Sequence, residues 1–297
     1  TTQLWLGVNE KSRKQLQKIV KPPKKAGFEN LATANTLLGL RLSLDWDAFW
    51  KFYKDNLPKE DRQTLMNKIE EYGQMAKVDM EKEVLDKLSG NIGVYFYGIA
   101  INNLAQLRQL GLMGAIPKMG LIVTLQFEDE ASLSKAADKL VSGSSGAVVR
   151  RPLKLEDGSK ASGVEVLAVK NVKTAPGRLY VKGDQLAFAT SALSEQSMYE
   201  YLTGDRPEGS IAEAGNLDLG KAFATEKVYN GLYLNMVRAE QHLGQKLGSK
   251  IPQVNKVFET IEEAALTGEV TDDGAFVTLT VDLEPSKSGD SKESDEK

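Results

Sequence analysis

The sequence contains no cysteine and a single histidine, His242. The absence of cysteine excludes disulfide frameworks, thiolate nucleophiles and cysteine-ligated zinc or iron–sulfur sites. A single histidine excludes any mechanism or metal site that requires two imidazoles. No uninterrupted apolar run approaches the roughly 20 residues that a membrane-spanning helix requires. Carboxylate, hydroxyl or lysine chemistry and pure binding are the functions that remain.

Sequence motifs that carry catalysis are also missing. There is no phosphate-binding loop, no Gly-x-Ser-x-Gly elbow, no His-Glu-x-x-His pair and no EF-hand spacing. The acidic groups Glu128–Glu130 and Asp272–Asp273 fall at a strand-to-helix junction and in a turn, where acids serve local structure. His242 follows Glu240 and Gln241 in a helical stretch and is expected to have no catalytic role. We therefore expect no catalytic residue, no cofactor and no metal, and a protein that is not an enzyme.

The composition is that of a globular protein with enough apolar material for a sizeable core. The 297 residues are 41% hydrophobic and 27% charged, with a mean hydropathy of −0.33. Both fractions lie near the averages for globular domains. One large domain or two ordinary domains are expected from this length.

Strand-then-helix units recur along the chain. The clearest are residues 39–44 followed by 45–53, 119–127 followed by 130–141, 186–190 followed by 194–202, and 231–236 followed by 240–247. In the first helix, Trp46, Phe49, Trp50 and Tyr53 share one face at i, i+3, i+4, i+7 spacing, which predicts a buried aromatic face capped by Asp45. Residues 59–88 are also expected to be helical, with Gly73 as a point of division.

Hairpin turns at Gly183-Asp184 and at residues 272–274 separate alternating apolar segments. The sequence therefore predicts an α+β fold with a mixed, largely antiparallel sheet and helices packed on one face. A seam at residues 143–146 would give two related halves, residues 1–142 and 147–285. Residues 286–297 lack any apolar side chain and are expected to form a disordered tail.

The first 25 residues are strongly basic, with seven bases and one acid in a chain whose net charge is −3. Lys11, Lys14, Lys18 and Lys21 follow each other at three- or four-residue steps and would share one helix face. One interpretation is attraction to an anionic surface such as phospholipid headgroups. The alternative is an ordinary solvated helix face.

The segment 101–117 differs from the rest because it is apolar with one charge, Arg108, and contains two glycines. We predict that it contacts a ligand or partner as a flap or surface segment; the alternative is a buried connecting helix. The predicted contact residues are Leu104, Leu107, Leu110, Leu112, Met113 and Ile116.

Five segments of the chain resemble the pattern of a bacterial envelope family of unknown function. One of them, residues 79–94, has an acidic helix and Leu-Ser-Gly before an apolar strand. The others are residues 37–46, 120–125, 179–189 and 264–282. Members of that family are predicted lipoproteins or secreted proteins with repeated strand-helix units. The resemblance implies export to the bacterial periplasm or cell surface, and supplies no active-site residues.

These observations favour a non-enzymatic, exported, envelope-associated binding or scaffold protein. An apolar groove would hold a lipid, peptide or protein partner, with peripheral membrane contact but no span, and nucleic acid is not expected because the chain is acidic. Two alternatives stay open: a hydrolase that uses dispersed carboxylates, and an architectural subunit of a surface assembly.

Overall fold

A computed structural model describes eleven strands and several helices of the chain. The described residues are 2–6, 9–21, 31, 35–100, 118–154, 160–169, 177–191, 194–195, 197–198, 230–241, 260–270 and 275–283. His242 and the predicted tail, residues 286–297, lie outside them.

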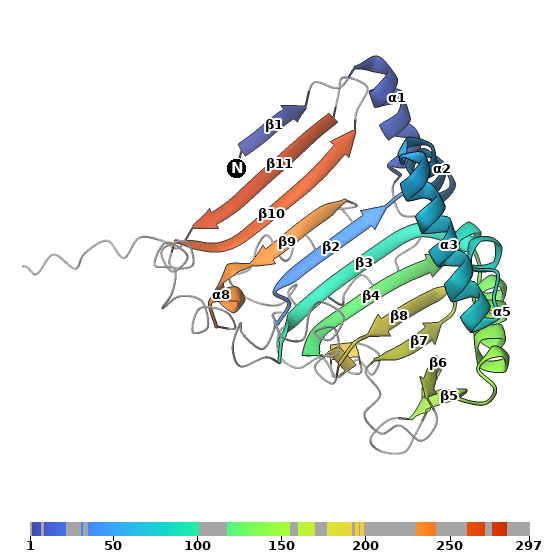
Figure 1. Ribbon diagram of the computed structural model, residues 1–297. Helices are drawn as coiled ribbons and strands as arrows, with labels where there is room; N and C mark the ends of the chain where they lie inside the picture. Colours follow the sequence, from blue (N-terminus) through green and yellow to red (C-terminus); the bar gives the residue numbers. More distant parts are fainter. Residues whose placement is uncertain are drawn as a thin grey trace, which may run out of the picture.

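The described strands form one eleven-stranded sheet, shown face-on in Figure 1. The spatial order of the strands is β1-β11-β10-β9-β2-β3-β4-β8-β7-β6-β5. Their bounds are β1 Thr2–Leu6, β2 Leu38–Ser43, β3 Leu88–Ile99, β4 Met119–Phe127, β5 Val148–Lys154, β6 Lys160–Val169, β7 Arg178–Lys182, β8 Gln185–Ala189, β9 Gly231–Asn235, β10 Ile261–Val270 and β11 Ala275–Leu283. Every pairing between them is antiparallel.

The helices stand in a row along one end of these strands (Figure 1). They are α1 Glu10–Ile19, α2 Trp46–Asn56, α3 Lys59–Ala76, the π-helical turn η2 Met80–Val84, the 3₁₀ turn η3 Leu85–Lys87 and α5 Glu130–Gly143. A short helix, α8 (Met236–Ala239), follows β9. The predicted α+β class is confirmed, with helices on one face of a sheet whose described pairings are all antiparallel.

Side-chain oxygens fix several helix starts where the sequence predicts them. Asp45 accepts a hydrogen bond from the backbone N–H of Ala48 at 2.9 Å, and Asp129 accepts one from Ser132 at 2.7 Å. Such caps satisfy amide groups that the first helical turn leaves without partners. The strand-helix units at residues 39–53 and 119–141 therefore form as expected.

The strands of the two predicted halves belong to one sheet, because β2 pairs with β9 and β4 pairs with β8. Strands β2, β3 and β4 lie in the middle of the sheet, with strands from residues 147–285 on both sides. That the two halves are related to each other stays a prediction.

The two faces of the sheet differ in composition. We call the side that carries Tyr95, Tyr180 and Tyr233 the tyrosine face; these three side chains are almost fully buried, together with Leu31 and Met198. We call the opposite side the leucine face, and its members are half-buried to exposed except beneath α5. Strand alternation assigns each residue to one face or the other.

Two local predictions are corrected by the structure. The aromatic face of α2 is only partly buried, because Trp50 is buried but Tyr53 is 40% exposed. Gly73 does not divide the helix at residues 59–76. A Cβ there would lie 2.6 Å from the carbonyl oxygen of Val78, so glycine allows the chain after α3 to return closely against it.

Candidate functional site

Burial on β2 is the reverse of what its alternation suggests. Gly39, Arg41 and Ser43 are buried, whereas the leucines between them, at positions 38, 40 and 42, are half-buried. An antiparallel strand normally turns its apolar residues to the core and its polar residues to water. In β2 the glycine and the polar residues lie on the buried tyrosine face, so the leucines lie on the opposite face.

Strand pairing extends this apolar surface across the sheet. Cα partners link one residue from each of eight neighbouring strands into a continuous row, and every member of the row is apolar. The row runs Leu279, Leu266, Leu232, Leu40, Val94, Val123, Phe188 and Leu179. Strands lie about 4.8 Å apart, so the row is about 34 Å long.

Two parallel rows widen the leucine face. One contains Leu38, Phe96 and Leu121, and the other contains Leu42, Ile92 and Leu125. Four residues along a strand span about 13 Å, so the face measures about 450 Å². The largest apolar patch on a typical monomer is about 300–600 Å² and is often functional. The leucine face has a footprint of that size, and α5 and α8 cover part of it.

Helix α5 covers one side of the leucine face. Its side chains Leu133 and Ala137 are buried against Phe127, Leu167 and Val181 of strands β4, β6 and β7. At the opposite end of the strands, Met236 and Ala239 of α8 pack with Phe96 and Leu234.

The leucine face is most open over β10 and β11. Leu266 is 40% exposed and Leu279, its partner across the strand pair, is 43% exposed. An apolar chain could lie along this part of the row without displacing any helix that packs on the sheet in the described structure.

The tyrosine face holds hydrogen-bonded polar groups in a closed interior. The Tyr233 hydroxyl donates to the buried Glu263 carboxylate at 2.6 Å, and the Tyr97 hydroxyl donates to the carbonyl of Leu31 at 2.7 Å. Burial, followed by the Glu263 hydrogen bond, raises the pKa of Tyr233 well above its usual range, and burial raises that of Tyr180 to about 12. Both phenols stay protonated and do not act as bases, and Tyr233 serves as a structural donor to Glu263.

Polar side chains also line a cavity of about 340 Å³ beside the helix-bearing end of the central strands. The Ser43 hydroxyl donates to Asn91 at 2.8 Å, the Asn91 amide donates to Gln126, and the Gln126 amide donates to Asp184 at 3.0 Å. Each side chain in this series donates a hydrogen bond to the next, so the polar groups buried here have partners.

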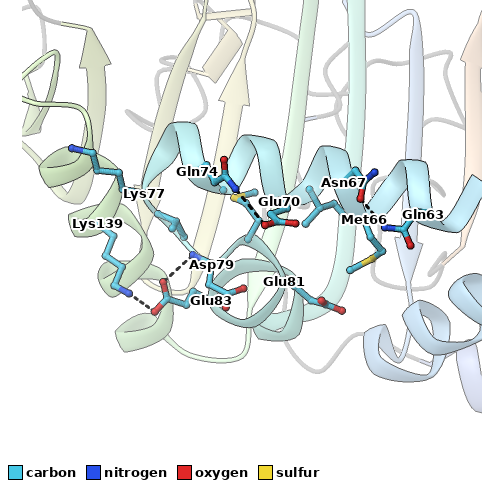
Figure 2. Close-up of a pocket in the computed structure, with 14 residues that line it drawn as sticks. Gln63, Met66, Asn67, Glu70, Gln74, Lys77, Asp79, Glu81, Glu83 and Lys139 are labelled. Carbon is cyan, nitrogen blue, oxygen red and sulfur yellow. Dashed lines mark hydrogen bonds and ion pairs between the residues drawn. The ribbon is translucent and has the colours of Figure 1, made fainter.

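A larger polar cavity, of about 660 Å³, lies between α3, η2 and α5 (Figure 2). Glu83 reaches into it and accepts hydrogen bonds from Lys139 of α5 and from the backbone N–H of Asp79. The hydrogen bond from Lys139 is the largest of the interactions that hold the pKa of Glu83 below its ordinary value. The backbone N–H of Lys82 does the same for the pKa of Asp79.

These acids are poorly suited to proton transfer. A general acid or base works best when its pKa lies near the working pH, whereas Asp79 and Glu83 are shifted further from neutrality. Within the described part of the chain, no group of three or more metal-ligating side chains is placed to hold an ion. In the cavity of Figure 2, the ion pair between Glu83 and Lys139 joins η2 to α5.

The contact residues predicted from the sequence, Leu104, Leu107, Leu110, Leu112, Met113 and Ile116, all lie outside the described residues. The basic stripe is described: Lys11, Lys14 and Lys18 are exposed on α1, and Lys21 follows the helix. Lys14 pairs with Glu10 at 2.7 Å and Lys21 pairs with Asp45.

Sequence reasoning missed the leucine face. Alternation shows that a strand has an apolar side, but not which side the tertiary fold closes. A usable signal was present in β2 and β9, where glycine, tyrosine, asparagine and arginine separate the leucines. Such residues are able to fill a hydrogen-bonded interior.

The sequence matches no family model and none of the curated proteins compared with it. Solved structures include two distant matches, both of the Treponema pallidum protein TP0453. Crystal form I matches at 10% identity and a TM-score of 0.37, over 89% of this chain and 81% of that chain. Crystal form III matches at 10% identity and a TM-score of 0.39, over 89% and 83%.

A likeness at these scores is too distant to carry an inference about function. No described helix is both long and apolar enough to cross a membrane.

Proposed function

We propose that this protein is a non-enzymatic binding protein that holds the apolar chain of an amphiphile, such as a lipid acyl chain, on its leucine face. We place it in the bacterial periplasm or at the cell surface, as the sequence resemblance implies. The observation that carries the proposal is the reversed burial on β2 and β9. On both strands the glycine, polar and aromatic residues are buried on the tyrosine face, whereas the leucines between them are only half-buried.

The size of the leucine face favours a small ligand over a second protein. A stable protein–protein interface buries about 800 Å² on each partner. The leucine face measures about 450 Å² from strand spacing, and α5 and α8 already cover part of it. The uncovered part over β10 and β11, where Leu266 and Leu279 are exposed, is smaller still and suits a single acyl chain.

The chemistry of the face matches an acyl chain and does not match a polar substrate. Every residue in the row from Leu279 to Leu179 is apolar. The ion pairs of η2 lie in a separate cavity, between helices. Binding would depend on removal of apolar surface from water, which returns about 25 cal/mol for each Å².

A titration with a fluorescent fatty acid tests this proposal. Leu266→Asp with Leu279→Asp places two carboxylates at the open end of the face, and we expect affinity to fall at least about tenfold because a charge there loses water when the chain binds. The matched control is Thr267→Asp with Thr278→Asp, which adds the same charge to the same two strands on the opposite side.

Equal loss of affinity in the two double variants, or no loss in the leucine variant, would contradict the assignment of the leucine face. Thermal unfolding of each variant shows whether it is folded. The segment 101–117 remains a second predicted contact. There, Leu107→Glu with Leu112→Glu is expected to abolish binding of the same fatty acid, while an unchanged affinity would remove that segment from the site.

A further inference from the structure

The basic helix α1 borders the open part of the leucine face. In Figure 1, α1 begins beyond the ends of β1, β10 and β11, and it is the first helix of the row. It contacts β10 and α2. Leu266 and Leu279 lie four residues from the ends of β10 and β11 that are nearest α1 in Figure 1, a distance of about 13 Å along the strands.

The lysines of α1 point to solvent. Lys11 and Lys18 are exposed, lie seven residues apart on one helix face and have no ionic partner among the described residues. The Lys14–Glu10 pair between them is mostly exposed, so water and salt screen it. This face of α1 therefore carries positive charge that Glu10, the acidic residue of the helix, does not neutralise.

The remainder of the chain has the opposite sign. The first 25 residues carry a net charge of +6, although the whole chain carries −3. An anionic surface would therefore attract α1 and repel most other parts of the molecule, which fixes the orientation of approach. Because α1 contacts β10, the same approach brings the neighbouring open end of the leucine face toward the surface.

From this arrangement we infer that α1 and the neighbouring open end of the leucine face form a docking surface for an anionic lipid bilayer. The inference rests on the proposed function, since the bilayer is the source of the amphiphile. Lys11 and Lys18 contact the headgroups, and Leu266 and Leu279 meet the acyl region from which the ligand transfers. The attraction acts within about 10 Å at moderate salt, which matches a peripheral contact.

Sedimentation with vesicles tests the inference on the full chain. Phosphatidylglycerol vesicles are compared with phosphatidylcholine vesicles of the same size, using Lys11→Gln with Lys18→Gln. Each lysine near an anionic surface contributes about fivefold in affinity, so the double variant is expected to bind phosphatidylglycerol about 25-fold more weakly. Lys59→Gln with Lys68→Gln, two exposed positions on α3, removes the same charge and is expected to change binding little.

Two results would overturn the inference: equal binding of the unmodified protein to both vesicle types, or equal losses in the α1 and α3 variants. The fatty acid titration separates this failure from failure of the proposed function. If the α1 variant binds free fatty acid normally and no preference for anionic vesicles exists, the docking surface is wrong and the leucine face stands. If the leucine variant binds free fatty acid normally, the proposed function itself is wrong.

Discussion

The two ends of the leucine face are built from the same kinds of residue but have different environments. Over β4, β7 and β6, helix α5 seals the apolar side chains, and Phe127 and Leu167 are buried. Over β10 and β11, Leu266 and Leu279 remain about 40% exposed. The strand sequences alone do not distinguish these two ends, and the position of one helix does.

This difference separates a stabilising role from a binding role within one continuous surface. Apolar residues beneath α5 contribute their burial to folding, because they leave water when the chain folds. Residues over β10 and β11 keep much of their apolar area in water, and that area is available for binding. Substitutions beneath α5 should therefore lower stability, and substitutions over β10 and β11 should lower ligand affinity.

The largest effect is expected at the sealed end, from Leu133→Ala on α5. Leu133 is 2% exposed in the cluster with Phe127 and Leu167, so its removal leaves a cavity. We expect the free energy of unfolding to fall by about 2–5 kcal/mol, measured by urea denaturation. A loss no larger than that caused by Leu266→Ala would show that α5 does not seal this end.

A smaller effect is expected from Arg150→Met, which removes a link between α5 and the sheet edge. Arg150 donates to Asp138 of α5 at 2.6 Å and to Glu165 of β6 at 2.6 Å. Because these partners are partly exposed, the loss of unfolding free energy should be about 1 kcal/mol and should shrink at high salt. Arg151→Met, at the exposed neighbouring position on β5, is the control and should be neutral.

Acid should loosen the sealed end before the open end. The pKa of Glu83 in the folded protein lies below its ordinary value of 4.5, mainly because of Lys139. The stabilisation is therefore complete above pH 4.5 and is lost as the pH falls through the lowered pKa. Hydrogen exchange should rise in α5 and η2 under these conditions, and Glu83→Gln should remove the difference. Equal acid sensitivity of β10–β11 would contradict this assignment.

The smallest effect on stability is expected at the open end, from Leu266→Ala with Leu279→Ala. Both side chains are already about 40% exposed, so the free energy of unfolding should change by no more than about 0.5 kcal/mol for each substitution. Fatty acid affinity should nevertheless fall, because the ligand loses apolar contact. A large loss of stability would mean that this end is part of the folding core.

Much of the local structure could be predicted from the residues. Asp45 and Asp129 mark the starts of α2 and α5, and Gly183-Asp184 marks the β7–β8 turn. These features depend on contacts within a few residues, so the sequence contains their cause. The spacing of the aromatic residues in α2 predicts that they share a face but not how deeply that face packs, so the exposure of Tyr53 could not be predicted.

The candidate site could not be predicted in the same way. Leucines at 38, 40 and 42 look like the core side of a strand, and the structure instead buries Gly39, Arg41 and Ser43. Which side becomes the interior depends on residues far apart in sequence, such as Tyr95 and Tyr233, which lie on either side of Gly39 in the sheet. No window of neighbouring residues contains that information.

The sequence by itself determined the alternation of the strands, the helix caps, the tight turns and the positive charge of the first helix, because each of these depends on nearby side chains and the backbone geometry they favour. Only the tertiary structure decided that β2 lies between β9 and β3, that the tyrosine side is closed, and that α5 covers one end of the leucines and leaves the other open. Burial belongs to the assembled sheet and not to a segment, since the same leucine is core or surface according to what packs upon it.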